Sequence, residues 1–90
     1  MSEKYKIIVK GKVQGVFFRD YTKKKADSMG LKGTVQNLSD GSVKIVVEHT
    51  ENIQDFIDWC WMGSPASSVE DVELEKFNSD EEFSSFEILL

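Results

Sequence analysis

Apolar and polar residues alternate along five short stretches of this chain, a pattern typical of half-buried β-strands. In the first stretch Tyr5, Ile7 and Val9 share one phase, and only Ile8 breaks the alternation. The pattern therefore predicts a sheet that packs one face against a core. The five stretches are residues 5–10, 33–38, 43–47, 69–75 and 86–90.

Two other segments carry apolar residues at helical spacing. Residues 20–29 predict a first helix, and residues 53–62 predict a second helix that ends before Gly63-Ser64-Pro65. The predicted apolar faces consist of Phe18, Ala26 and Met29 for the first helix, and of Ile53, Phe56, Ile57 and Cys60 for the second.

These elements follow the order β-α-β-β-α-β, with a short strand added at the C-terminal end. This order predicts the α+β class and the split βαβ, or ferredoxin-like, arrangement. Both helices must then pack on one face of an antiparallel sheet to bury their apolar stripes. Asp40-Gly41, between two strand patterns, predicts a tight hairpin.

A chain of 90 residues suffices for one core, so we expect a single domain over residues 1–90.

Charge is distributed unevenly along the sequence. The net charge is −5, but residues 1–44 carry 10 Lys or Arg against 4 Asp or Glu, and residues 45–90 carry 1 Lys against 12 Asp or Glu. A positive field around the first half would attract a small anion. Chance segregation of solvated charges is the alternative interpretation.

The sequence shows neither a secretory signal nor a membrane span. No apolar region follows Met1-Ser2-Glu3-Lys4, and no apolar run approaches the roughly 18 residues of a transmembrane helix. The single Cys60 cannot form an internal disulfide, which fits a reducing compartment. We therefore expect a cytoplasmic protein without a membrane partner.

A glycine-containing loop joins the first predicted strand to the first helix, with the sequence Gly11-Lys12-Val13-Gln14-Gly15-Val16-Phe17-Phe18-Arg19. Glycine allows positive φ and close approach to the backbone. A curled loop that presents N–H groups before a helix is an anion site. Arg19, the only arginine, carries a planar fork that matches phosphate or carboxylate oxygens. The spacing alone fits a tight turn with a surface arginine equally well.

Asn37 is the second residue of interest. A period of two puts it on the same face as Val35, near the end of a predicted strand. If Val35 faces the core, the Asn37 amide points toward the helix-covered side, where it can both donate and accept hydrogen bonds. On spacing alone, the simpler interpretation is that Asn37 opens the turn toward Asp40-Gly41.

The residue inventory gives little support to metal or nucleophile chemistry. One His and one Cys do not make a ligand set. His49 lacks an obvious nucleophile partner, and Cys60 is expected to be buried and inert on its helix face. No Walker-type Gly-Lys-Ser/Thr sequence is present. We therefore expect no metal and no cofactor.

Several segments together resemble the acylphosphatase signature, and they span nearly the whole chain. They are Gly11 to Arg19, Gly30 to Asn37, Asp40 to Val43, and Gly63 to Val69, which follows the second helix. The resemblance implies a hydrolase that cleaves the carboxylic-phosphoric anhydride of acyl phosphates to carboxylate and inorganic phosphate. Inorganic phosphate would then be both product and inhibitor. We expect a monomer.

The resemblance also implies roles for individual residues. Arg19 would bind the phosphate, and Asn37 would position the attacking water. The reaction would be a metal-free in-line attack, with the substrate's own phosphate accepting the proton. The phosphate-binding loop would consist of the backbone of Gln14, Gly15, Val16, Phe17, Phe18 and Arg19.

Two positions depart from the family's common pattern. Thr34 stands where an aromatic residue is frequent, and His49-Thr50 stands where a glycine usually follows the third strand. Both concern local packing, not the chemistry.

The alternative function is a non-catalytic ferredoxin-like module that binds a small anion or RNA. An RNA binder would stack bases on exposed aromatic residues of the open sheet face. Tyr5 is in phase with the core positions, so we expect no nucleic-acid partner.

Overall fold

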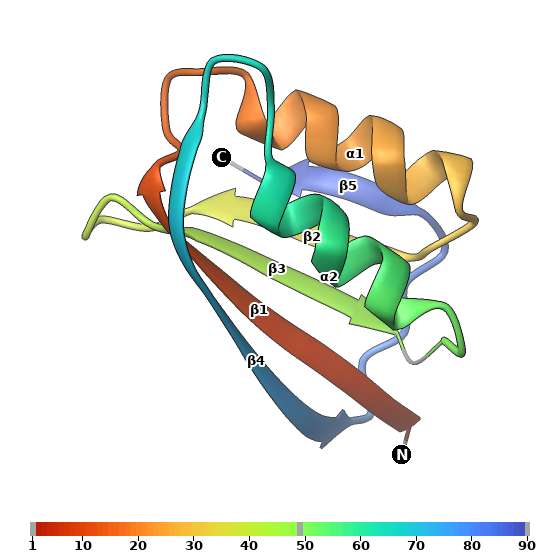
Figure 1. The fold of residues 1–90 in the computed structure, drawn as a ribbon. Helices are drawn as coiled ribbons and strands as arrows, with labels where there is room; N and C mark the ends of the chain where they lie inside the picture. The colour runs from red at the N-terminus through yellow and green to blue at the C-terminus, as the bar shows by residue number, and fades with distance from the viewer. Residues whose placement is uncertain (1, 49, 90) are drawn as a thin grey trace.

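The computed structural model describes residues 2–48 and 50–89. Figure 1 shows both helices on one face of a five-stranded sheet, which confirms the predicted α+β, ferredoxin-like arrangement. The predicted order of strands and helices is also confirmed. The elements are β1 (Ser2–Lys12), α1 (Phe18–Ser28), β2 (Gly33–Asn37), β3 (Val43–Glu48), α2 (Ile53–Met62), β4 (Ser68–Ser79) and β5 (Phe86–Leu89).

The sheet is mixed, with the strand order β4-β1-β3-β2-β5. Neighbours among β4, β1, β3 and β2 run antiparallel, but β5 runs parallel to β2. The prediction of an antiparallel sheet is therefore wrong for the fifth strand. The reason is topological: residues 80–85 cross from one edge of the sheet to the other, so β5 starts at the same end of the sheet as β2 (Figure 1).

The core lies between the sheet and the two helices. In β3 the alternation is regular, with Val43, Ile45 and Val47 fully buried between half-buried neighbours. The predicted helix faces are confirmed as well. Phe18 and Ala26 of α1 are buried, as are Phe56, Ile57 and Cys60 of α2. None of the helices among the described residues is long and apolar enough to cross a membrane.

Strand β4 is longer than predicted and contains an irregularity. It extends to Ser79, beyond the predicted end at residue 75, because it pairs along the whole of β1. The register shifts between Lys10 and Gly11, which lets Val69 and Val72 both pack against the core although they are three residues apart. Gly11 has φ 126°, and a Cβ there would lie 2.2 Å from the Ser68 carbonyl oxygen, so only glycine fits.

The basic and acidic halves of the sequence lie side by side in the sheet. Lys10 Nζ is 3.1 Å from Glu73, and Lys6 Nζ is 3.7 Å from Glu75, each pair joining β1 to β4. Hydrogen bonding and charge attraction from Glu73 raise the pKa of Lys10. Exposed pairs of this kind add little stability. They do cancel part of the positive field that the sequence alone predicts for the first half.

Candidate active site

The turn between β1 and α1 forms one wall of a pocket. Val13 and Val16 are buried and fix the ends of the turn in the core. Helix α1 begins at Phe18, two residues before the predicted start, because the Tyr21 amide already donates to the Phe17 carbonyl (3.1 Å). Arg19 therefore lies within the first turn of the helix and is not a loop residue.

Side chains from two other parts of the chain hold this turn in place. Gln14 Nε2 donates to the carbonyl oxygens of Leu38 (2.7 Å) and Ser42 (2.8 Å) in the β2–β3 hairpin. Ser64, just after α2, donates from its hydroxyl to the Val16 carbonyl (3.0 Å). Figure 1 shows the loop after β1 and the loop after α2 at the same end of the molecule. The turn is thus fixed relative to both β2 and α2.

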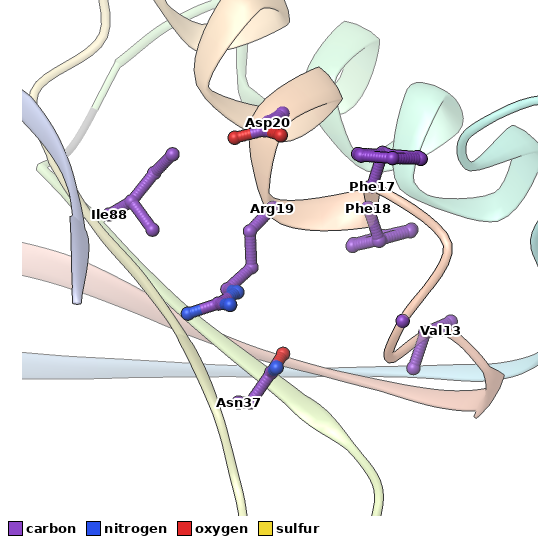
Figure 2. A pocket seen from close by; sticks show the side chains of 8 residues that line it. Val13, Phe17, Phe18, Arg19, Asp20, Asn37 and Ile88 are labelled. Atoms are coloured by element: carbon purple, nitrogen blue, oxygen red, sulfur yellow. The ribbon is translucent and has the colours of Figure 1, made fainter. Parts of the chain in front are cut away.

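A pocket of about 290 Å³ opens between this turn, α1, and strands β2 and β5. It brings together Arg19 and Asn37, the two residues that the sequence singles out, and Figure 2 shows their side chains extending toward each other. Four of the six predicted loop residues line it, whereas Gln14 and Val16 do not. The lining residues are Val13, Gly15, Phe17, Phe18, Arg19, Asp20, Asn37 and Ile88.

Arg19 is oriented by the last described strand. Its Nη1 atom donates to the carbonyl oxygen of Leu89 in β5 at 2.9 Å. A guanidinium has five N–H donors in a rigid fork, so the remaining donors stay available to a ligand in the pocket. The hydrogen bond restricts the fork before any ligand binds.

Asn37 is the last residue of β2, so the strand itself directs its amide toward the pocket. Its Oδ1 atom is buried and has no hydrogen-bond partner among the described residues. An unsatisfied buried acceptor typically costs about 1–3 kcal/mol. A ligand or water that donates to Oδ1 would remove this cost.

Phe17 has an unusual backbone conformation. With φ 61° and ψ 22°, it is the only non-glycine residue with positive φ in the part of the chain that the structure describes. For a residue with a Cβ, this left-handed conformation costs roughly 1–2 kcal/mol. Such strain is concentrated at functional sites, where the surrounding structure holds it.

Among the described residues, no group of side chains forms a competing metal site, and the one cysteine is buried. Residues 2–48 and 50–89 contain no group of three or more His, Cys, Asp or Glu side chains that could hold a metal ion. Cys60 is buried, as predicted, and its desolvation raises the pKa of the thiol from 9.0 to about 12. His49 lies outside the described residues.

Comparisons with known proteins identify the family of the chain. The sequence model of the acylphosphatase family matches residues 5–88. The chain belongs to the acylphosphatase family. The acylphosphatase of Shewanella amazonensis is 46% identical over 83 residues, which is 91% of each chain. The acylphosphatase of Pelotomaculum thermopropionicum is 41% identical and covers 91% of this chain and 90% of its own. The crystal structure of the Bacillus subtilis acylphosphatase matches with a TM-score of 0.91 and 40% identity, over 98% of this chain and 99% of that one.

The matched range includes every residue that lines the pocket. Thr34, which departs from the common acylphosphatase pattern, does not line it. Thr34 lies opposite Val46 in the sheet instead. Its departure therefore lies in the sheet, outside the lining of the pocket.

The predicted site, residues 14–19 and Asn37, omits several contributors that the structure reveals. Val13, Asp20 and Ile88 line the pocket, and Ser64 holds the turn. Asp20 could have been found, because it follows Arg19 directly. Ser64 lies within the segment from Gly63 to Val69 that resembles the acylphosphatase signature, but its role could not be read from it. Only the tertiary structure brings Ile88 in β5 and the end of α2 to this turn.

Proposed function

We propose that this chain hydrolyses acyl phosphates, cleaving the carboxylic-phosphoric anhydride to carboxylate and inorganic phosphate. The observation that carries the proposal is the convergence of Arg19 and Asn37 on one pocket beside the turn after β1. Membership of the acylphosphatase family, and the names of the relatives it matches, support the same activity. We further propose that the enzyme is a monomeric single domain that acts in the cytoplasm.

In the proposed complex, the phosphoryl oxygens accept hydrogen bonds from the backbone amides of residues 14–19 and from the Arg19 guanidinium. These amides lie at or just before the N-terminus of α1, where the helix dipole adds partial positive charge. Phosphoryl transfer leaves little covalent work to the protein, so positioning and charge stabilisation dominate. The hydrogen bond to Leu89 prepares Arg19 for this role, because it restricts the fork in advance.

Asn37 would orient the attacking water. Its Oδ1, which has no hydrogen-bond partner among the described residues, accepts a hydrogen bond from water, and this turns a lone pair of the water oxygen toward phosphorus. The water oxygen bonds to phosphorus while the bond from phosphorus to the carboxylate oxygen breaks. One water proton passes to a phosphoryl oxygen of the substrate. A carboxylic acid has a pKa near about 4, so the carboxylate leaves without a general acid.

The test is the release of phosphate from benzoyl phosphate by the wild-type protein and by Asn37→Ala. Loss of one positioned hydrogen-bonding group typically lowers kcat by roughly 10²–10³-fold. The Ki of inorganic phosphate should change little, because Arg19 and the amides remain. Gln36→Ala is the control: it alters the neighbouring residue on the opposite face of β2 and should keep its activity.

The two main results separate the hypotheses. Wild-type protein that binds phosphate but releases none from benzoyl phosphate would support the non-catalytic anion-binding module. Asn37→Ala protein with an unchanged kcat would leave the hydrolysis in place and remove the role of Asn37. The chelator EDTA should leave the rate unchanged, because the proposed steps use only groups of the chain and of the substrate.

A further inference from the structure

Phe17 is an exposed aromatic residue that the fold does not require. The residue is 72% exposed, so it contributes little to the core. Its left-handed backbone would be adopted more easily by glycine or asparagine. The side chain nevertheless lines the pocket. A strained, exposed aromatic side chain beside a ligand site indicates a function in binding.

The position of Phe17 relative to Asn37 indicates which part of a substrate it meets. Figure 2 shows Asn37 at one end of the pocket and Phe17 and Asp20 at the other, with Arg19 between them. In an in-line displacement the leaving group departs on the side opposite the attacking water. If water is held by Asn37 and the phosphoryl group by Arg19, the acyl group extends toward Phe17.

We propose that Phe17 is a specificity-determining residue that contacts the acyl group, and that this pocket selects acyl phosphates whose acyl group is neutral and apolar or aromatic. This inference rests on the proposed function. An aromatic ring of the substrate would pack against the exposed Phe17 ring and bury apolar surface that is otherwise in water. A methyl group, as in acetyl phosphate, is too small to gain much from this contact.

Asp20 strengthens the selection for neutral acyl groups. Its carboxylate lies at the same end of the pocket as Phe17, in the first turn of α1. An acyl group with its own negative charge would be repelled there, because like charges that lie close together disfavour binding. The pocket thus carries an attractive element for apolar acyl groups and a repulsive one for acidic acyl groups.

The experiment compares kcat/KM for benzoyl phosphate, acetyl phosphate and succinyl phosphate in the wild-type protein and in four variants, two at Phe17, one at Asp20 and one at Met62. Phe17→Gly removes the ring and suits the backbone conformation, and Phe17→Asn keeps a side chain that tolerates it. We expect the ratio of benzoyl to acetyl phosphate kcat/KM to fall roughly three- to tenfold in both. Met62→Ala is the control, because Met62 is 74% exposed but does not line the pocket, so the ratio should stay at the wild-type value.

A binding measurement makes the test independent of turnover. Phenylphosphonate and methylphosphonate carry the same anionic group with and without a ring. Phe17→Gly should weaken the binding of phenylphosphonate relative to methylphosphonate by a similar factor, measured as two Kd values by calorimetry.

Asp20→Asn should raise kcat/KM for succinyl phosphate relative to that for benzoyl phosphate.

The outcomes distinguish this inference from the proposed function. If the wild-type protein hydrolyses the acyl phosphates, but both Phe17 variants keep the wild-type ratio of benzoyl to acetyl phosphate, the acyl selection is wrong and the hydrolysis stands. An equal loss of kcat/KM for all three substrates would mean that Phe17 acts only through its backbone in the loop, and this result would also contradict the acyl selection. If the wild-type protein hydrolyses none of them, the proposed function fails and the acyl selection fails with it.

Discussion

The first turn of α1 and the last turn of α2 lie on the same side of the sheet but contribute differently to the pocket. Helix α1 supplies Phe18, Arg19 and Asp20 to the pocket lining, whereas α2 supplies no lining residue. Helix α2 instead packs Trp59 against Phe18, with ring centroids 5.6 Å apart, and the chain after it holds the turn through Ser64. One helix thus presents chemical groups and the other supports them. Substitutions of the pocket-lining residues in the first turn of α1 should therefore change activity, and substitutions on α2 should change mainly stability.

The largest expected effect is that of Arg19→Ala. It should lower kcat/KM for benzoyl phosphate by about 10³-fold, because it removes the charged fork from the phosphoryl group. It should also abolish the stabilisation by phosphate. At ten times its Kd, phosphate stabilises the folded state by RT ln 11, about 1.4 kcal/mol. For a domain of this size, this is a Tm increase of roughly 6–11 °C, measured in a thermal melt at fixed ionic strength.

Lys23→Ala is the matched control for this prediction. Lys23 lies one turn further along α1 and, like Arg19, donates to a carbonyl of β5, in this case that of Phe86 at 2.7 Å. It does not line the pocket. Lys23→Ala should keep both the activity and the phosphate-dependent shift. Equal phosphate shifts in the two variants would mean that phosphate acts through the solvent or at another site.

On the supporting helix, Trp59→Ala should lower the free energy of unfolding by about 2–3 kcal/mol. The half-buried ring contacts Phe18 and also stacks on Phe56, so its loss opens a cavity between the helix and the pocket wall. Urea unfolding measures the effect. At a temperature where both proteins are folded, kcat should stay within about threefold of wild type.

Trp61 provides the comparison on the same helix. It is exposed and lies outside the core, so Trp61→Ala should change the free energy of unfolding by less than about 0.5 kcal/mol. A large loss of kcat in folded Trp59→Ala would contradict the view that α1 carries the groups that act in the pocket and α2 only supports them.

The substitution Ser64→Ala tests whether weakening the hydrogen bond that holds the turn also lowers the activity of the residues that line the pocket. Ser64→Ala leaves the buried Val16 carbonyl without its hydroxyl donor, which should destabilise the protein by about 1–2 kcal/mol. Because the turn would then be held less firmly, kcat/KM should fall by roughly three- to tenfold. Ser67→Ala is the control, since its hydroxyl donates only to Ser64 O within the same loop. If Ser64→Ala is destabilised but fully active, Ser64 supports the fold and not the turn's geometry.

The smallest expected effect concerns Cys60. Burial raises the pKa of its thiol from 9.0 to about 12, so the thiol is protonated at neutral pH. Iodoacetamide should therefore not label the folded protein, and labelling should rise with urea in parallel with unfolding. Because the thiol ionises at a lower pH in the unfolded chain than in the folded protein, the free energy of unfolding should be constant with respect to this group below pH 9.0. It should then fall as the pH rises from 9.0 toward 12. Rapid labelling of the folded protein at pH 7 would show that α2 opens locally.

Local sequence patterns predicted much of the molecule. Each feature predicted in this way depends on a few neighbouring residues only. Helix α2 has the predicted bounds, since its apolar stripe and Gly63 both lie within the segment. The hairpin after β2 also forms, because Asp40 accepts hydrogen bonds from the Ser42 amide and hydroxyl, which lower the pKa of its carboxyl group. The length of β4 was not predictable from its own residues, because pairing with β1 extends it through polar positions.

The sequence by itself determined the strand and helix periods, the loop before α1, and the choice of Arg19 and Asn37 as candidate site residues. The periods and the loop rest on residue type and spacing within single segments, whereas the choice of Arg19 and Asn37 rests also on the resemblance of several segments to the acylphosphatase signature. Only the tertiary structure decided that β5 runs parallel beside β2, that Leu89 orients Arg19, and that Ser64 holds the turn. It also decided that Phe17 lies across the pocket from Asn37. These contacts join residues far apart in the sequence, and their partners are mostly backbone carbonyls, which every residue carries and no sequence pattern reveals.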